Sequence, residues 1–422
     1  MLVQFSVGNF LSFKEIVTLS MLAAKIKPQI EDNMFTVGRL QLLKSAVIYG
    51  SNASGKSNLV KAMAIMVQLM RNSSKESQVT ESIPVEHYKL STKSDEEPSF
   101  FEMVFIAEGI RYRYGFEVNQ KKVLREWLYH VPNERESMLF ERIDREFHIK
   151  GQFKEGRNLD EKTRDNALFL SVVAQFNGKI SGRIMNWLNS FNIISGIEDV
   201  NYAGFTIDRL QNSNLKNKIL DVIKAADLDI DDIYIEQVPI NPEQFPAGTP
   251  DFIKQMILVQ PNVKNTIIQT KHKKYNENNK IDSIETFNMS ESESHGTQKI
   301  FALAGPIVDT LECGKVLVVD ELDAKLHPHL TKFIMGLFNS ELNRRNAQLI
   351  FNTHDVNLLD SKKLRRDQIW FTNKDRYGAT DVYSLVEFQT RSDAQFRKEY
   401  MAGKYGATPV LNELEEVLWI EK

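Results

Sequence analysis

The residues with the clearest chemical potential lie in a glycine-rich segment that follows a short hydrophobic run. This segment reads Gly-Ser-Asn-Ala-Ser-Gly-Lys-Ser and matches the phosphate-binding pattern G-x-x-x-x-G-K-[ST] in full. Its glycines let the backbone wrap around phosphates, and the N–H groups at the start of the following helix hold the anion. We expect Lys56 to contact the β- and γ-phosphates and the Ser57 hydroxyl to bind Mg²⁺. The candidate nucleotide contacts are Gly50, Ser51, Asn52, Ala53, Ser54, Gly55, Lys56 and Ser57.

A second candidate group is a pair of carboxylates at the end of the apolar run Val316 to Val319. Such a run predicts a buried strand that delivers Asp320 to the carboxyl edge of a sheet, where ligands bind in open α/β folds. Asp320 suits Mg²⁺ held through water, and Glu321 is placed to polarise an attacking water as a general base. A strand end followed by an acidic helix start is common by itself, but the glycine-rich segment favours the catalytic interpretation.

Two further segments complete the set of candidate residues. His354 follows another β-type run, where an imidazole can donate to the γ-phosphate and report its loss after hydrolysis; a structural histidine is the alternative. Hydroxyls and a glycine at the start of a predicted helix from Thr297 to Leu311 form a possible second anion site, although Ser294 also fits a simple N-cap. The residues of this second segment are Ser294, Gly296, Thr297 and Gln298.

The elements that must position these residues alternate between strand and helix. Strands are predicted at 45–49, 316–319 and 348–351, each ending at a candidate residue or just before one, and a helix is predicted at 58–70. A β-meander is expected from about 100 to 153, and the pattern over 166–195 indicates helix. Alternating strands and helices predict a mostly parallel, three-layer α/β core.

Composition excludes several classes of protein. The chain has 422 residues, 53 Lys and Arg against 56 Asp and Glu, and a single cysteine, Cys313. This balance excludes a surface that is basic throughout, and one cysteine excludes a disulfide framework or a cysteine-based zinc cluster. No apolar run approaches the roughly 20 residues of a membrane helix, and no export signal is recognisable. We expect a cytoplasmic protein that does not insert into a membrane.

The order of these motifs resembles that of ABC-type ATPases. The chain is most similar to the bacterial RecF/SMC-like branch of stand-alone AAA-family ATP-binding proteins, which includes abortive-infection and other phage-defence ATPases. Supporting segments are Asn9 to Phe13, Glu321-Leu322-Asp323 and Arg366 to Phe371. The resemblance implies an α/β ATPase head with a mixed sheet, an antiparallel β subdomain and an inserted helical lobe.

The resemblance also implies roles for individual residues. The segment Ser294 to Gln298 would be the signature that completes the ATP site of a second subunit, with Thr297 where an ABC signature usually has glycine. Asp323 would belong to the loop that crosses the dimer interface. Gln175 is the candidate for the glutamine that couples Mg²⁺ to the helical lobe; the alternative is an ordinary polar helix residue. The implied halves of the head are 1–175 and 290–422, with the inserted lobe at 176–289.

The implied function is an ATPase that binds ATP and Mg²⁺, dimerises head-to-tail or forms a higher oligomer, and acts through a separate effector or toxin in phage defence. The alternatives are a RecF-like ATPase of DNA repair or recombination, and a scaffold that hardly hydrolyses ATP, against which the Asp320-Glu321 pair argues. DNA is a candidate partner because five lysines lie between 264 and 280, although a solvated hairpin or loop also explains them. Phe13 is a candidate for stacking on adenine or, equally, a core aromatic.

Overall fold

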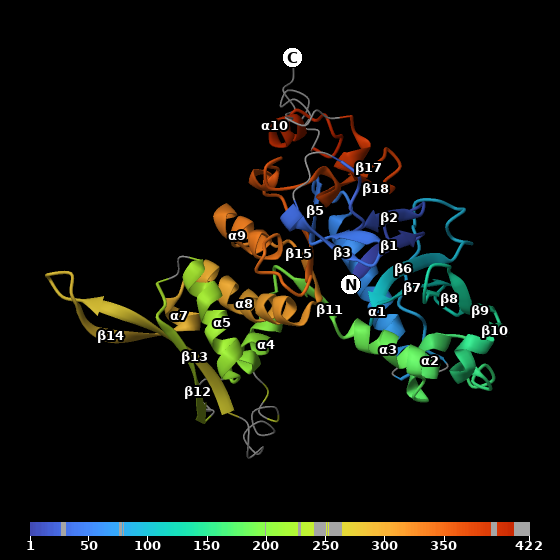
Figure 1. Ribbon diagram of the computed structural model, residues 1–422, viewed down its shortest axis with the longest axis horizontal. Helices are drawn as coiled ribbons and strands as arrows, with labels where there is room; N and C mark the ends of the chain where they lie inside the picture. Colours follow the sequence, from blue (N-terminus) through green and yellow to red (C-terminus); the bar gives the residue numbers. More distant parts are fainter. Residues whose placement is uncertain are drawn as a thin grey trace. The chain divides into compact units, whose positions relative to one another are not determined.

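In the computed structural model the chain forms two compact units. The structure describes residues 1–26, 31–75, 78, 80–198, 200–226, 229–239, 250, 252, 264–389 and 395–408. The first unit contains Met1–Ile197, Thr310–Ala324 and Pro328–Lys422, and the second contains Glu198–Asp309 and Lys325–His327. Both units are drawn in Figure 1. Among the described residues, none of the helices has the length and apolar character that a membrane span requires.

The first unit is built on a six-stranded sheet of order β11-β15-β16-β5-β17-β18, in which only β18 runs antiparallel to its neighbour. Every residue of β5 and β16 is buried, as expected for central strands of a sheet covered on both faces. The helix α1 follows β5 directly and buries Leu59, Met63 and Met66 along one side. The bounds are β5 Ser45–Gly50, α1 Lys56–Asn72, β11 Phe191–Ser195, β15 Val316–Asp320, α9 Pro328–Phe338, β16 Gln348–Asn352, β17 Ile369–Lys374, β18 Thr380–Ser384 and α10 Phe396–Met401.

A seven-stranded antiparallel sheet forms the rest of this unit, with the order β10-β9-β8-β7-β6-β1-β2. It contains the predicted β-meander and adds the two N-terminal strands. Aromatic side chains fill its inner face, and Phe105 stacks on Trp187 of α3 with ring centroids 4.0 Å apart. The bounds are β1 Leu2–Gly8, β2 Val17–Ser20, β6 Ser99–Ala107, β7 Ile110–Val118, β8 Val123–Val131, β9 Ser137–Ile143, β10 Glu146–Ile149, α2 Phe169–Gln175 and α3 Lys179–Leu188, beside the hairpin β3 Met34–Val37 and β4 Leu40–Leu43.

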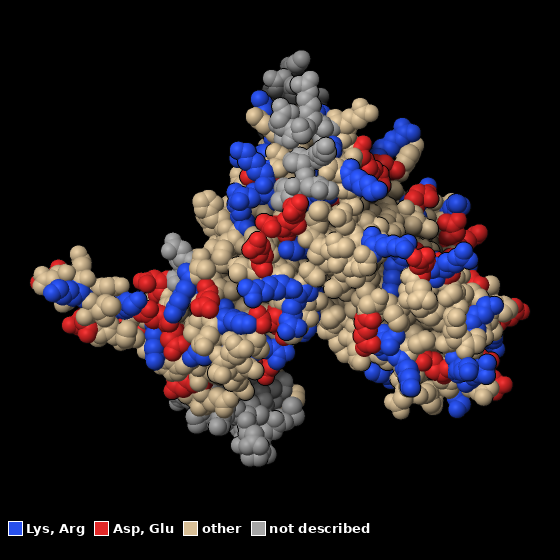
Figure 2. Space-filling model, in the orientation of Figure 1, with Lys and Arg blue, Asp and Glu red and all other residues tan. Residues whose placement is uncertain are grey.

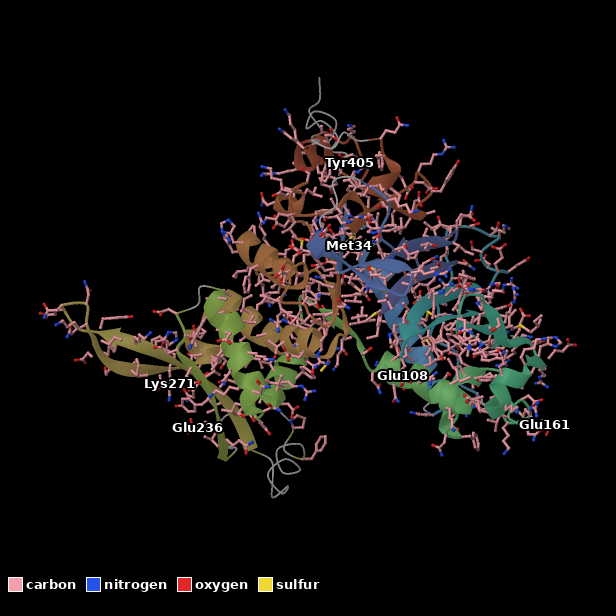
Figure 3. The ribbon with its side chains drawn as sticks, in the orientation of Figure 1. Met34, Glu108, Glu161, Glu236, Lys271 and Tyr405 are labelled. Carbon is pink, nitrogen blue, oxygen red and sulfur yellow. The ribbon has the colours of Figure 1, made fainter. Side chains whose placement is uncertain are left out.

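The second unit combines helices with a three-stranded antiparallel sheet of order β12-β13-β14. Figure 3 labels Glu236 on β12 and Lys271 on β13. The lobe was predicted at 176–289, but this unit starts later, at Glu198, because α3 belongs to the first unit, and it ends later, at Asp309, because it includes most of α8. The lobe is therefore only partly helical. The bounds are α4 Val200–Leu210, α5 Ser213–Ala225, β12 Asp232–Pro239, β13 Lys264–Tyr275, β14 Ile281–Asn288, α7 Met289–Ser292 and α8 His295–Cys313.

A proline inside α8 is compensated by a neighbouring helix. Pro306 has no N–H group to donate to the carbonyl of Ala302, four residues earlier. The hydroxyl of Thr206, on α4, donates to that carbonyl oxygen at 2.7 Å and accepts from the N–H of Gly305 at 3.2 Å. The contact satisfies the carbonyl that proline leaves free and fixes α4 against α8 within the second unit.

One predicted element needs correction. The segment 166–195 was expected to be helical, but after α2 and α3 its last residues form the strand β11. β11 pairs in parallel with β15, with Phe191 opposite Val316 and Ser195 opposite Asp320. This distant partner decides the conformation, because a short apolar run of this kind fits helix or strand equally well locally. Most of the proline-rich segment 239–250 lies outside the described residues.

Candidate functional site

The glycine-rich segment forms a tight loop between β5 and α1, as the sequence predicts. Gly55 has φ = +109° and Ala53 has φ = +59°, a left-handed backbone region that glycine adopts at little cost. The loop thus turns the first N–H groups of α1 toward the carboxyl edge of the sheet, where an anion can be held. Ser57 lies in the first turn of α1 and is half-buried.

Hydroxyl groups from the sheet hold this loop in place. The Ser54 and Thr372 hydroxyls lie 2.6 Å apart, and the Thr380 hydroxyl lies 2.9 Å from the Ser54 carbonyl oxygen and 2.8 Å from the Ser12 hydroxyl. A Cβ atom on Gly55 would lie 2.4 Å from the Thr380 hydroxyl oxygen. The loop therefore requires glycine at position 55 for its backbone angle and for this close approach, and the supporting residues Thr372 and Thr380 were not identified from the sequence.

Lys56 is buried at the base of the loop. Its ammonium group donates to the carbonyl oxygens of Gly50 at 2.9 Å and Ser51 at 3.0 Å. Burial lowers the pKa of Lys56, while the nearby carboxylates of the 320–323 segment act in the opposite direction. The lysine and the acidic pair therefore share one electrostatic environment, as the predicted phosphate site requires.

The acidic pair is fixed by an asparagine that sequence reasoning missed. Asn352, fully buried at the end of β16, donates its side-chain amide to a carboxylate oxygen of Asp320. Its amide oxygen accepts from the backbone N–H of Glu321 at 2.6 Å. Glu321 has φ = +56°, a conformation unusual for a residue other than glycine and typical of strained functional positions. The only sequence signal for Asn352 is its place at a strand end next to His354.

His354 lies two residues beyond β16, at the same edge. Its backbone N–H donates to a carboxylate oxygen of Asp323 at 3.1 Å. Burial is the first cause that lowers the pKa of His354, and the charge of Lys56 is the second; Asp323 and Glu321 oppose both. The imidazole is thus favoured in its neutral form near the lysine and the acidic pair.

The strands bring these residues together because β15, β16 and β5 are parallel neighbours. Their carboxyl ends carry Asp320, Asn352 and Gly50, and β11 adds Ser195 opposite Asp320. The N–H of Gly196 donates to the Asp320 carbonyl oxygen at 2.6 Å. The end of β11 therefore belongs to the same edge, a contribution that was missed because this segment was predicted to be helical.

The signature residues form the start of α8 in the second unit. The Ser294 hydroxyl accepts from the Thr297 N–H at 3.1 Å and lies 2.9 Å from the Thr297 hydroxyl, so Ser294 caps the helix. The Gln298 side chain donates to the Glu293 carbonyl oxygen at 3.0 Å. Gly296 is half-exposed and has room for a side chain, since the nearest atom to an added Cβ would be 3.5 Å away. The predicted anion site of the signature stays a prediction.

The structure does not bring Gln175 to the loop. Gln175 ends α2, and Ser171 of α2 contacts Ser74, just past the end of α1, with the two hydroxyls 2.7 Å apart. The 17 residues of α1 span about 25 Å at 1.5 Å per residue, so this contact lies one helix length from Ser57. We therefore do not retain Gln175 as a metal ligand. Phe13 is fully buried in the core, which excludes stacking on adenine.

A family model described as "AAA domain, putative AbiEii toxin, Type IV TA system" matches residues 45–360. The chain belongs to this family of AAA-domain ATPases. The match contains the phosphate-binding loop, the acidic pair and His354, and it confirms the resemblance to stand-alone AAA-type ATPases. The predicted fold class, an α/β P-loop ATPase head with a mixed sheet and an antiparallel β subdomain, is confirmed as well.

The solved structures that match this chain include two SMC heads and the recombination mediator RecF. An SmcHead bound to the C-winged helix domain of ScpA has 12% identity and a TM-score of 0.44, covering 91% of this chain and 97% of its own. The SMC head domain from Thermotoga maritima has 13% identity and a TM-score of 0.40, covering 91% and 98%. The recombination mediator RecF has 16% identity and a TM-score of 0.35, covering 90% and 98%. No curated protein sequence matches this chain.

The donor set at this edge fits a nucleotide with Mg²⁺. Oxygen ligands such as the Ser57 hydroxyl and the Asp320 carboxylate are those that Mg²⁺ prefers. One carboxylate oxygen of Asp323 is buried without a hydrogen-bond partner among the described residues, which leaves an acceptor beside His354. The loop glycines and the buried Lys56 ammonium suit a polyphosphate.

Proposed function

We propose that this protein binds ATP with Mg²⁺ and hydrolyses it. The observation that supports this most directly is the convergence of Lys56, Asp320, Glu321 and His354 at the carboxyl ends of adjacent parallel strands. Mg²⁺, when bound, would neutralise phosphate charge between Ser57 and Asp320.

Each residue then has a distinct task. Lys56 and the loop N–H groups hold the phosphates, and Glu321 accepts the proton of the attacking water. Asn352 positions Glu321 through its N–H and Asp320 through its carboxylate. His354, favoured as the neutral imidazole, donates to the terminal phosphate and loses this partner after hydrolysis.

Two variants separate binding from turnover. Lys56→Ala is expected to lose ATP affinity, because the phosphate charge loses its buried partner. Glu321→Gln is expected to bind ATP as the wild type does and to lose hydrolysis, because only the base is removed. Both are checked by equilibrium ATP binding and steady-state phosphate release. Wild-type turnover by Glu321→Gln would refute the assignment of the base.

We further propose a cytoplasmic head-to-tail dimer, or a higher oligomer, that passes its nucleotide state to a separate effector or toxin in phage defence. The description of the family, which names an AbiEii-type toxin system, supports this role. The described residues offer no second catalytic constellation, so the state of the switch would be read by another protein. The Glu321→Gln protein, which should hold bound ATP, serves as the bait for capture of partners from the native host. After nuclease treatment, it should retain the product of a neighbouring gene.

The alternative is a RecF-like ATPase that binds DNA through the lysines of β13. The contacts of these lysines within the protein favour a protein effector over DNA as the partner. The Lys273 ammonium lies 2.8 Å from Asp231, Lys274 lies 3.1 Å from Glu285, and Lys271 lies over the Tyr234 ring at 5.2 Å. On the face shown in Figure 2, basic and acidic side chains are interspersed. DNA-stimulated ATP hydrolysis that is lost in Lys271→Ala would nevertheless promote the DNA-repair function.

A further inference from the structure

The start of α8 is tied to the neighbouring sheet of the second unit by one acidic side chain. Glu293 immediately precedes Ser294, the N-cap of α8, and its backbone is extended. One of its carboxylate oxygens accepts from the Thr270 hydroxyl at 2.6 Å and lies 2.7 Å from Nε2 of His272. Thr270 and His272 lie two residues apart on β13, so their side chains project from the same face of the sheet. Glu293 therefore connects β13 to the signature segment.

This contact is shielded from water. The side chains of His272 and Glu293 are 17% and 10% exposed, and Thr270 is fully buried. An ionised carboxylate can only accept, so Nε2 of His272 carries the proton in this contact. The His272 ring also packs against Phe287 of β14, with ring centroids 4.7 Å apart. The sheet thus holds both donors in place for the carboxylate.

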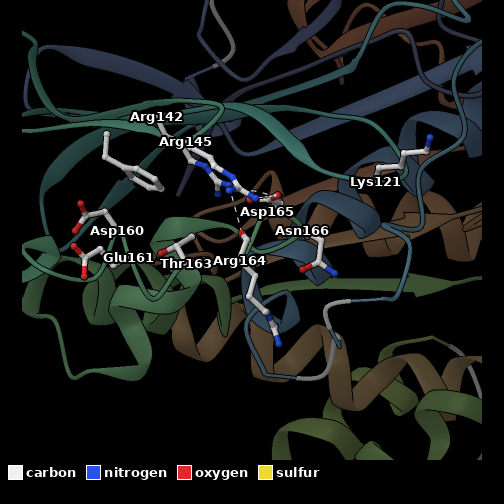
Figure 4. A pocket seen from close by; sticks show the side chains of 10 residues that line it. Lys121, Arg142, Arg145, Asp160, Glu161, Thr163, Arg164, Asp165 and Asn166 are labelled. Atoms are coloured by element: carbon white, nitrogen blue, oxygen red, sulfur yellow. Dashed lines mark hydrogen bonds and ion pairs between the residues drawn. The ribbon is translucent and has the colours of Figure 1, made fainter.

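Ion pairs at the surface of the first unit are of a different kind. In the polar pocket of Figure 4, Arg145 and Asp165 form a bidentate contact at 3.1 and 2.7 Å, but their side chains are 79% and 44% exposed. Pairs that are this open to water contribute little, because solvent screens them. The contact between His272 and Glu293 is far better shielded, and its loss should release the segment that it holds.

Two further contacts hold the same segment from the helix side. The Gln298 side chain donates to the backbone carbonyl oxygen of Glu293 at 3.0 Å, and the Ser294 hydroxyl accepts from the Thr297 N–H at 3.1 Å. Residues 293–298 and β13 are therefore joined through both the backbone and the side chain of Glu293. The first N–H groups of a helix have no acceptor within the helix, and here these contacts fix their position.

The Glu293 carboxylate must be kept away from these N–H groups if they are to hold a phosphate. A helix N-terminus favours any anion, and a carboxylate that precedes the helix can accept from its first N–H groups. In the proposed head-to-tail dimer, the same groups would face the nucleotide of the other subunit. A released Glu293 side chain would compete with that phosphate, whereas the donors on β13 engage it elsewhere.

We propose that Thr270 and His272 position the signature segment for ATP hydrolysis, by holding the Glu293 carboxylate on β13 and the start of α8 in a fixed place. They are positioning residues, since they contact Glu293 and act through it. The inference rests on the proposed shared ATP site. It predicts that a change on β13 lowers turnover while ATP still binds to Lys56 and the phosphate-binding loop.

The test uses the full-length protein and measures equilibrium ATP affinity, phosphate release at saturating ATP, and ATP-dependent dimerisation by light scattering. His272→Ala and Glu293→Ala each remove one partner, and the double variant removes both. Glu293→Gln keeps an acceptor oxygen and the shape of the side chain. The control Lys274→Gln removes an exposed ion pair of the same strand, 3.1 Å from Glu285. Hydrogen exchange reports whether any loosening is confined to 293–299.

We expect each alanine variant to lower turnover about tenfold and to keep its ATP affinity within about twofold of the wild type. The double variant should be no slower than either single variant, because each already breaks the contact. Glu293→Gln and the control should stay near the wild-type rate, and faster exchange should be confined to 293–299. Thr270→Val keeps the volume of a buried side chain and should cost about threefold, so it serves if an alanine variant unfolds.

Three results would overturn the inference. The first is wild-type turnover by the folded alanine variants or, where these unfold, by Thr270→Val. The second is losses that multiply in the double variant, which would show that His272 and Glu293 act independently. The third is faster exchange across all of β12–β14, which would show general unfolding of the sheet. A wild-type protein that binds ATP but neither dimerises nor hydrolyses it would instead refute the proposed function itself, and this inference with it.

Discussion

At the scale of single residues, the acidic pair shows how a short polar contact supports chemistry. Glu321 is held at φ = +56°, which costs on the order of 1–3 kcal/mol for such a residue. The buried amide of Asn352 offsets this cost by accepting the Glu321 N–H and by orienting Asp320 at the same time. One side chain therefore fixes both the proposed metal carboxylate and the proposed base.

Replacing Asn352 by alanine is expected to lower steady-state ATP hydrolysis by about 10- to 100-fold, the range typical of residues that orient metal ligands. ATP affinity should change far less, because Lys56 and the loop N–H groups are untouched. Thermal unfolding of the variant serves as the control for folding. Hydrolysis at the wild-type rate by a folded Asn352→Ala protein would show that the contact is merely structural.

His354 gives a dependence of stability on pH. Its pKa is lowered from 6.5, first by burial and then by Lys56, so the folded state favours the neutral ring. Above the ordinary pKa both states are neutral, and as the pH falls below it the unfolded chain takes up the proton first. This contribution to stability is therefore lost on acidification, and the loss should be small because His354 is only partly desolvated and part of the residue is exposed to water. In denaturant titrations between about pH 7.5 and pH 5.5, His354→Asn should lose less stability than the wild type; an identical loss would contradict the assignment.

At the scale of elements, the phosphate-binding loop depends on two strands that lie against it in the folded protein. β17 and β18 come more than 300 residues after the loop in the sequence, yet Thr372 and Thr380 contact it directly. The β18 strand therefore acts as a rigid support, and the hydroxyl of Thr380 sets how closely the loop can approach it.

Two glycine substitutions separate this contact from backbone strain. Gly109→Ala places a Cβ at φ = +76° with no atom within 4 Å, and should cost about 1–2 kcal/mol of unfolding free energy. Gly55→Ala adds the clash with Thr380 and should cost clearly more, together with a loss of ATP binding. Chemical denaturation and nucleotide titration measure both effects. Equal destabilisation by the two variants would show that backbone strain alone explains the glycine.

At the scale of the whole molecule, the phosphate-binding loop and the signature helix belong to different compact units. The proposed head-to-tail dimer would combine the loop of one subunit with the signature of the other, as a symmetric pair shares two equivalent sites. Thr297 is only 7% exposed, so a large charged side chain there would threaten the fold. Gly296 has room for a side chain in the first helical turn, where an aspartate is tolerated.

Mixing Lys56→Ala with Gly296→Asp protein should therefore restore hydrolysis. Each variant alone is inactive, because both of its sites carry one defect, whereas a mixed dimer has one site with neither. Phosphate release is measured across mixing ratios, with circular dichroism of each variant as the control. If both proteins are folded and activity returns at no ratio, the shared site is refuted.

The sequence by itself determined the phosphate-binding loop, the strand with its acidic pair and the strand before His354. In each case the requirement is local: glycines for a left-handed turn, β-branched residues for a buried strand and a carboxylate at its end. The β-meander was predictable for the same reason. These segments carry their conformational preference within a few neighbouring residues.

Only the tertiary structure decided which residues surround the phosphate-binding loop and the acidic pair. The segment that ends at Ser195 became a strand because β15 lies beside it, and Gln175 was separated from Ser57 by the length of α1. Asn352, Thr372 and Thr380 acquired their roles through contacts between residues far apart in sequence. Such contacts depend on strand order and helix packing, which local residue patterns do not encode, because each is stabilised by burial that exists only once distant segments have met.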